Sequence, residues 1–102
     1  MKKYLVIGNP IEHSLSPKLH NYWFNLYNID SLYKKKEVQE TDLEKIISQV
    51  KENKISGINV TVPFKKTIIK YLDTLSEVAK KTQSVNTIFM RKNKIYGDNT
   101  DC

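Results

Sequence analysis

The sequence predicts an α/β protein with a mainly parallel open sheet, helices on both faces and a C-terminal antiparallel hairpin. Three predicted strands alternate with two stretches of helical periodicity, and strands joined by helices pair in parallel and become covered on both faces. Two further strand-like runs then meet at a two-residue turn, which predicts the hairpin. The 102 residues suffice for one modest core, so we predict a single domain spanning residues 1–102.

The chain begins with a strand–helix–strand pattern. Residues 3–8 are a short apolar run closed by a glycine, which is typical of a buried strand. Ser16 before Pro17 is typical of a helix start, and apolar residues at helical spacing extend this helix to about Tyr27. Residues 32–38 predict a second strand, and its lysine-rich centre favours the edge of the sheet.

The clearest helix of the chain leads into its central strand. Thr41 and Glu44 have the spacing of a capping box at the start of a helix over about residues 42–53. The strand Ile58–Val62 follows, and Pro63 ends it. Alternation places three apolar side chains on one face of this strand, Ile58, Val60 and Val62.

Two short helices and two strands make up the remainder. Residues 65–72 have a helical pattern, and the capping-box spacing of Thr74 and Glu77 predicts another short helix ending near Thr82. A strand over residues 84–90 and a partner over residues 94–98 then flank Lys92–Asn93, the predicted tight turn.

Composition excludes several classes of protein. The net charge is +6, but only Arg91 among the 17 basic residues is arginine and no nucleic-acid motif occurs, so we predict no nucleic-acid partner. No apolar run approaches the roughly 20 residues that span a bilayer, which predicts no membrane partner. The N-terminal apolar run is too short for a secretory signal and Cys102 is the single cysteine, so we expect a reducing, cytoplasmic setting.

Polar side chains around the central strand are candidates for a binding site. Asn59 and Thr61 share the second face of that strand, and Lys65 follows its exit, where ligands bind in open α/β sheets. Ser14 and Ser16 lie at the predicted helix N-terminus, which suits a carboxylate or phosphate. The alternative is that Ser16 only caps the helix, Ser14 faces water and the strand has a solvated polar face.

An acid–base pair and a buried amide are further candidates. Lys65 with Asp101 would place an ammonium beside a carboxylate, an arrangement able to protonate a carbonyl oxygen during reduction. Spacing alone leaves Lys66 and Asp98 as alternatives. Asn86 lies among apolar residues and requires partners, either a ligand hydroxyl or backbone groups.

Two common kinds of cofactor site are missing from the sequence. His13 and His20 lack metal-ligand spacing with cysteine or glutamate, so no metal is expected. The three glycines do not form a G-x-G-x-x-G loop for a nucleotide.

Three motifs in order resemble the N-terminal, substrate-binding domain of shikimate dehydrogenases. They are VIGNPIEHSLSP near the start, NVTVPFK in the middle, and SVNT followed by GDNTD at the end, and they span essentially the whole chain. The resemblance implies an NADP-dependent oxidoreductase that reversibly reduces 3-dehydroshikimate to shikimate in chorismate and aromatic amino-acid biosynthesis. A quinate-using relative and a non-catalytic small-molecule binding module are the alternatives.

The resemblance also implies roles for the candidate residues. Ser14 and Ser16 would bind the shikimate carboxylate, and Lys65 with Asp101 would form the catalytic pair in preference to Lys66 and Asp98. The ring hydroxyls would be bound by four residues, Asn59, Thr61, Asn86 and Asp101. Leu15, between the serines, replaces a residue that is polar in many members.

The chain is much shorter than the members of this family. They continue into a nucleotide-binding domain with a glycine-rich loop for NADP, and this domain is missing here. The chain starts at Met1, so we expect the truncation to be C-terminal, the fragment to bind no cofactor and the isolated chain to be inactive. The choices between NAD and NADP and between shikimate and quinate, and the oligomeric state, are left open.

Overall fold

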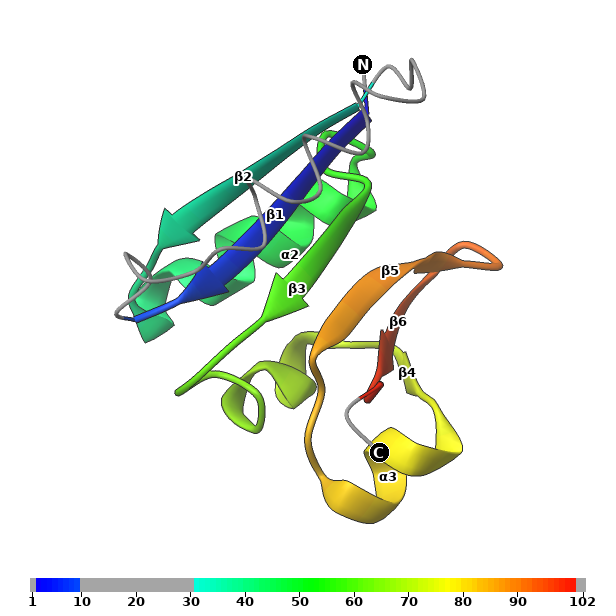
Figure 1. The fold of residues 1–102 in the computed structure, drawn as a ribbon. Helices are drawn as coiled ribbons and strands as arrows, with labels where there is room; N and C mark the ends of the chain where they lie inside the picture. The colour runs from blue at the N-terminus through cyan, green and yellow to red at the C-terminus, as the bar shows by residue number, and fades with distance from the viewer. Residues whose placement is uncertain (1, 10–30, 101–102) are drawn as a thin grey trace.

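A computed structural model describes residues 2–9 and 31–100 and contains one six-stranded sheet (Figure 1). The strand order is β2-β1-β3-β5-β6-β4, and three of the five neighbouring pairs are parallel. The predicted α/β class and the mainly parallel, open sheet are confirmed.

The first three strands form the parallel half of the sheet. β1 (Lys2–Gly8) lies between β2 (Ser31–Glu37) and β3 (Gly57–Val60), and it pairs in parallel with both. β2 occupies the edge that its lysines predict, where charged side chains oppose pairing with another chain.

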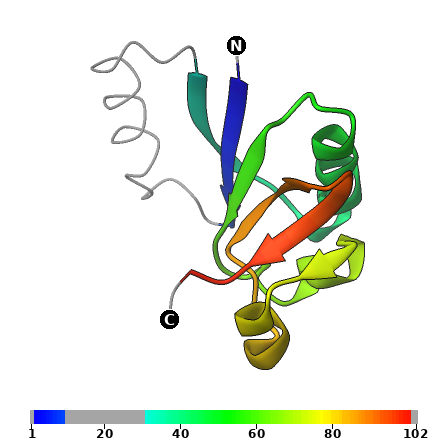
Figure 2. The same ribbon diagram turned by 90° about the vertical axis from the view of Figure 1, so that its right-hand side faces the viewer.

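The helix between β2 and β3 covers one face of the sheet, as Figure 2 shows. It consists of the 3₁₀ turn η1 (Glu40–Asp42) followed by α2 (Leu43–Lys51). The prediction that Thr41 caps the helix is wrong, because the first turn starts earlier and the Gln39 N–H donates to Asp42 Oδ2 at 2.9 Å. The helix predicted at residues 17–27, expected on a second face, lies outside the described residues.

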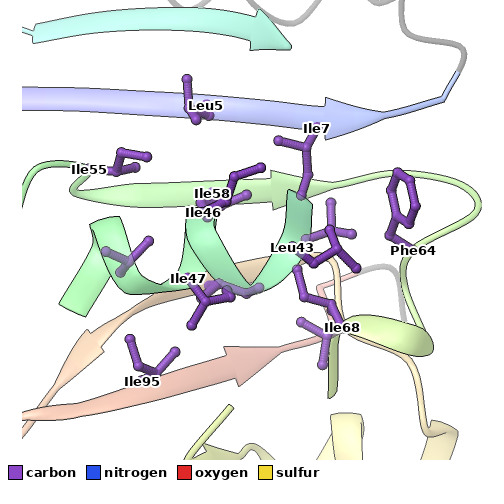
Figure 3. Close-up of a cluster of buried hydrophobic side chains, with 14 of the residues drawn as sticks. Leu5, Ile7, Leu43, Ile46, Ile47, Ile55, Ile58, Phe64, Ile68 and Ile95 are labelled. Carbon is purple, nitrogen blue, oxygen red and sulfur yellow. The ribbon is translucent and has the colours of Figure 1, made fainter. Parts of the chain in front are cut away.

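The core lies between α2 and the sheet (Figure 3). The four buried residues of α2 recur at helical spacing and face side chains of the strands. The cluster of buried residues contains Leu5, Ile7, Val38, Leu43, Ile46, Ile47, Val50, Ile55, Ile58, Val60, Phe64, Ile68, Ala79, Val85, Ile88 and Ile95.

The segment after β3 is less regular than the sequence predicts. The helix expected over residues 65–72 is the 3₁₀ helix η2 (Thr67–Tyr71), which is followed by the two-residue strand β4 (Thr74–Leu75). The prediction that Thr74 caps the next helix, α3 (Glu77–Thr82), is therefore wrong. Ser76 is the cap, and its Oγ accepts from the Ala79 N–H at 3.1 Å.

The C-terminal hairpin is confirmed. β5 (Thr87–Arg91) begins three residues later than predicted and pairs antiparallel with β6 (Lys94–Asp98). Lys92 and Asn93 form the turn with φ of 53° and 64°, the left-handed conformation that a two-residue hairpin needs. β5 is also antiparallel to β3, so β6 runs in the same direction as β1 and β3.

Gly97 allows β6 to pack closely against its neighbours. A Cβ atom at this position would lie 2.6 Å from Leu72 Cδ1 and 3.1 Å from Val85 Cγ2. A side chain at residue 97 would therefore overlap the core.

The described residues contain neither a long apolar helix nor a metal-like cluster. None of their helices has the length and apolarity needed to cross a membrane. Within residues 2–9 and 31–100, no three side chains of histidine, cysteine, aspartate or glutamate gather as metal ligands would.

Candidate functional site

Three strand ends meet at one edge of the sheet. Because β1, β3 and β6 run in the same direction, their C-terminal ends lie on the same side, together with the start of β5 (Figures 1 and 2). Ligands of open α/β sheets bind at the carboxyl ends of strands. We call this edge the C-terminal edge, and the sequence-predicted site residues lie on it or next to its strands in sequence.

A closed turn follows β3 at this edge. The Phe64 N–H donates to the Thr61 carbonyl at 3.1 Å, and the Val62–Pro63 peptide is cis. The Asn9 N–H donates to the Val62 carbonyl at 3.1 Å, so the exit of β1 lies against the turn. The predicted strand to Val62 is too long, because β3 ends at Val60; Val62 is 65% exposed and does not join the core.

Thr61 makes two contacts with β1. Its N–H and its Oγ1 both donate to the Ile7 carbonyl oxygen, each at 2.9 Å. A hydroxyl has one hydrogen, so this side chain keeps only acceptor capacity for a ligand. Thr61 can therefore receive a hydrogen bond from a ligand hydroxyl but cannot donate one without losing its contact with Ile7.

Asn59 lies on the strand itself, half-buried, in register with Val6 of β1 and Thr87 of β5. Ile58 next to it is in the core, so Asn59 points to the other face. A groove of about 500 Å³ starts at Asn59 and Thr87 and extends away from the C-terminal edge, towards Lys2 at the start of β1 and Met90 near the end of β5.

Lys65 follows Phe64, whose buried side chain anchors the turn in the core. Phe64 is 3% exposed, Lys65 is half-buried and Lys66 is exposed. The Lys65 carbonyl accepts from the Val85 N–H at 2.8 Å, so the turn is attached to the segment that carries Asn86.

Asn86 is buried, as the sequence predicts, and the structure provides partners within the chain. Its Oδ1 accepts from the Thr100 N–H at 3.0 Å and from Thr87 Oγ1 at 2.9 Å, and its Nδ2 donates to Thr100 Oγ1 at 3.1 Å. Its main chain bridges β3 and β6 through Val60 and Asp98. Asn86 therefore joins the exit of β3 to the exit of β6.

Three candidates lie outside the described residues: Ser14, Ser16 and Asp101. The last described residues before them in sequence, Asn9 and Thr100, are both at the C-terminal edge. The alternative carboxylate, Asp98, has Oδ1 occupied by the Asn99 N–H at 2.8 Å.

Sequence reasoning missed the residues that hold this edge together. Thr100 and Asn99 are part of the GDNTD motif, but the sequence predicts no role for either, and it predicts only a helix end at Thr82. Asn99 is 8% exposed and its Nδ2 donates to Thr82 Oγ1 at 3.1 Å. In the sequence, Asn99 and Thr100 are recognisable only as polar residues next to a strand. Their partners, Thr82 and Asn86, lie 17 and 14 residues away along the chain.

A larger groove lies away from this edge, between β2 and the end of α2. It has a volume of about 570 Å³. Its lining includes two buried apolar residues, Leu5 and Ile55, and five exposed lysines, Lys3, Lys34, Lys35, Lys36 and Lys54. β2 is an edge strand, so lysines there protect against pairing with other chains. We place the candidate site at the C-terminal edge because the polar contacts converge there.

The fold and the polar edge define a small α/β substrate-binding domain. Residues 6–88 match the family model described as the shikimate dehydrogenase substrate binding domain. The chain belongs to this family, and the resemblance seen in the three motifs is confirmed.

Individual relatives agree with the family assignment. The chain is 58% identical over 100 residues to the shikimate dehydrogenase (NADP(+)) of Pelagibacter ubique, covering 98% of this chain. A Listeria monocytogenes shikimate 5-dehydrogenase solved in complex with shikimate and NAD is 35% identical, with a TM-score of 0.91 over 99% of this chain. The Thermus thermophilus enzyme, solved with NADP(H) and shikimate, is 29% identical, with a TM-score of 0.89 over 99% of this chain.

The chain spans only part of these relatives. It covers 38% of the Pelagibacter protein, 35% of the Listeria chain and 38% of the Thermus chain. The activity of the longer proteins is therefore a proposal for this chain.

Proposed function

We propose that this chain is the substrate-binding and catalytic-residue-bearing domain of an NADP-dependent shikimate dehydrogenase. The reaction is the reversible reduction of 3-dehydroshikimate to shikimate in chorismate and aromatic amino-acid biosynthesis. The observation that carries the proposal is the shared edge of β1, β3 and β6, because each strand end adjoins one of the three motifs of the family. The single cysteine fits the cytoplasmic setting that we propose for the protein.

The substrate carboxylate binds to Ser14 and Ser16 in this proposal. The ring hydroxyls bind to four other residues, Asn59, Thr61, Asn86 and Asp101. The Thr61 hydroxyl donates to Ile7, so it accepts a hydrogen bond from the substrate. Asn86 is held by Thr87 and Thr100, which gives its amide a defined orientation towards a ligand.

Lys65 and Asp101 act as the acid–base pair of the proposed reaction. The Lys65 ammonium donates a proton to the carbonyl oxygen of 3-dehydroshikimate, and the same amine takes the proton back in the reverse direction. Asp101 orients the ammonium and shares its proton. The half-buried Lys65, beside the Phe64 anchor, suits this role better than exposed Lys66.

NADP does not fit the described residues of this chain. In its reduced form, a bound cofactor would supply the hydride for the carbonyl carbon. Gly57 and Gly97 lie in strands, where they pack against Tyr4 and Leu72, and the sequence has no glycine-rich loop for a diphosphate. We propose that residues of the longer protein hold the cofactor and that this chain alone is inactive.

Turnover by the full-length enzyme that carries this domain tests the catalytic assignment. Lys65→Met should reduce kcat for shikimate oxidation by about 100-fold or more, the contribution typical of a general acid, with a smaller change in KM. Lys66→Met is the matched control and should keep kcat near the wild-type value. Near-normal turnover by Lys65→Met would contradict the role of Lys65.

The sequence also fits a second candidate function. We propose that the chain on its own is a non-catalytic binding module for shikimate, because it has no glycine-rich loop for the cofactor. Titration with shikimate should shift amide resonances around residues 14–16, 59–65, 86 and 101. The same titration with quinate separates a shikimate domain from a quinate/shikimate domain, because equal shifts would favour the latter.

A further inference from the structure

The side-chain oxygen of Asn86 is surrounded by donors from its own chain. Asn86 is 9% exposed. Its Oδ1 accepts from the Thr100 N–H at 3.0 Å and from Thr87 Oγ1 at 2.9 Å, and Thr100 Oγ1 is a further donor at 3.3 Å. An amide oxygen has two lone pairs, so contacts within the chain use the acceptor capacity of this side chain.

The backbone of Thr100 determines which way the Asn86 amide is turned. The oxygen and nitrogen of an asparagine side chain are told apart by their hydrogen-bond partners. A backbone N–H can only donate, so the Asn86 atom 3.0 Å from the Thr100 nitrogen is the oxygen. Nδ2 is then the atom that donates to Thr100 Oγ1 at 3.1 Å. Whatever Asn86 offers to a ligand is therefore an N–H.

Thr87 is the partner of Asn86 that the sheet itself holds. It lies in β5, half-buried, in register with Asn59 of β3 on one side and with Asp98 of β6 on the other. The branched Cβ of threonine restricts rotation of its side chain, so the hydroxyl has a defined direction. Its single hydrogen goes to Asn86 Oδ1, whereas Thr100 lies beyond the end of β6.

We propose that Thr87 is a positioning residue, which holds the Asn86 amide so that it donates an N–H to a ring hydroxyl of the substrate. The inference rests on the proposed function, in which Asn86 binds such a hydroxyl. Thr61 has the opposite polarity, because its hydroxyl donates to Ile7 and can only accept from a ligand. A substrate hydroxyl at Asn86 therefore acts as an acceptor and one at Thr61 acts as a donor.

The first test compares Thr87→Val with Thr87→Ser in the full-length enzyme. Valine keeps the branched shape but removes the donor, so Asn86 Oδ1 loses a partner and the amide is less firmly oriented. Serine keeps the hydroxyl. KM for shikimate should rise about fivefold in Thr87→Val, as for one lost hydrogen bond, while kcat stays within about twofold of wild type. Both constants should stay within about twofold in Thr87→Ser.

A second variant, Asn86→Asp, tests the direction of the hydrogen bond to the substrate. Aspartate has nearly the same shape and keeps acceptor oxygens for Thr87 and Thr100, but an ionised carboxylate cannot donate. KM for shikimate should therefore rise at least about tenfold in this variant. An unchanged KM would overturn the donor role of Asn86, and this result is informative even if Thr87→Val fails to fold.

A stability control separates positioning from general loss of structure. Ile88→Val removes one methyl group from the core next to Thr87, where Ile88 is 0% exposed, and should lower the melting temperature with little effect on KM. Equal rises of KM in Thr87→Val and Ile88→Val at equal loss of stability would overturn the positioning role, as would a wild-type KM in Thr87→Val. Failure of the wild-type enzyme to oxidise shikimate would instead overturn the proposed function.

Discussion

Replacing Thr61 by valine should weaken shikimate binding without destabilising the fold. Valine has the same shape but lacks the oxygen that we expect to accept a hydrogen bond from a ring hydroxyl. One neutral hydrogen bond contributes about 1 kcal/mol, so the dissociation constant should rise roughly fivefold.

The structure explains why stability should be preserved. Ile7 O accepts both from the Thr61 hydroxyl and from the Thr61 N–H, each at 2.9 Å. The hydrogen bond from the residue 61 N–H survives in the variant, so the Ile7 carbonyl keeps a partner. The free-energy penalty of a buried polar group without a hydrogen bond therefore does not arise. We therefore expect the free energy of unfolding to fall by less than about 1 kcal/mol.

Calorimetric titration with shikimate and urea unfolding measure the two quantities separately. Thr61→Ser, which keeps both the donor and the acceptor, is the matched control and should bind as wild type. If the isolated chain binds too weakly to titrate, KM of the full-length enzyme provides the same comparison. Unchanged affinity in Thr61→Val would refute its role as a ligand, and a loss of several kcal/mol in stability would refute the reasoning about the Ile7 carbonyl.

Three stability predictions concern the second half of the chain. Gly97→Ala should lower the free energy of unfolding by about 1–3 kcal/mol, because its Cβ would overlap the core. Gly57→Ala should lower it less in the same thermal unfolding assay, because its Cβ would lie 3.1 Å from the ring of Tyr4, which can move. Ser76→Ala should cost about 1 kcal/mol by removing the cap of α3, whereas Thr74→Ala should leave that cap intact; equal costs in urea unfolding would contradict the assigned cap. Lys92→Asn should raise the free energy of unfolding by about 0.5–1 kcal/mol, because asparagine adopts the positive φ of 53° more readily than lysine does. An unchanged melting temperature would contradict this prediction.

Local patterns predicted the strands that have a clear apolar signature. β1 was predicted within one residue of its start, and the β5–β6 turn was placed at the correct two residues. The end of the central strand was predicted two residues too late, because alternation continues to Val62 after the pairing with neighbouring strands has ended. Side-chain spacing reports which face a residue would take, but not where the neighbouring strand stops pairing.

The errors at the helix starts have a different physical cause. β4 has only two residues, and it exists because Thr74 pairs with Tyr96 and Leu75 with Gly97. No local signal specifies a strand that short, so Thr74 looked like a cap while Ser76 performs that role. The partner across the sheet lies more than 20 residues away in sequence, beyond the reach of a local motif.

The sequence predicted which residue types form the candidate site, but it did not predict the contacts between them. Asn86 was correctly expected to be buried and to need partners. Those partners include Thr100, 14 residues further along, and Thr87 beside it. Because spacing cannot identify a contact that depends on the antiparallel placement of β5, the supporting roles of Asn99 and Thr82 emerged only from the fold.

The direction of β5 also gives the molecule a convenient place for a reporter group. The hairpin tip, Lys92–Asn93, lies at the opposite end of β5 from Asn86, and six residue steps of extended chain separate Asn86 from Lys92 by roughly 20 Å. A fluorophore or a surface tether attached at the tip would therefore leave the C-terminal edge unobstructed. Immobilised in this way, the domain would present its candidate site to the solution for direct measurement of ligand binding.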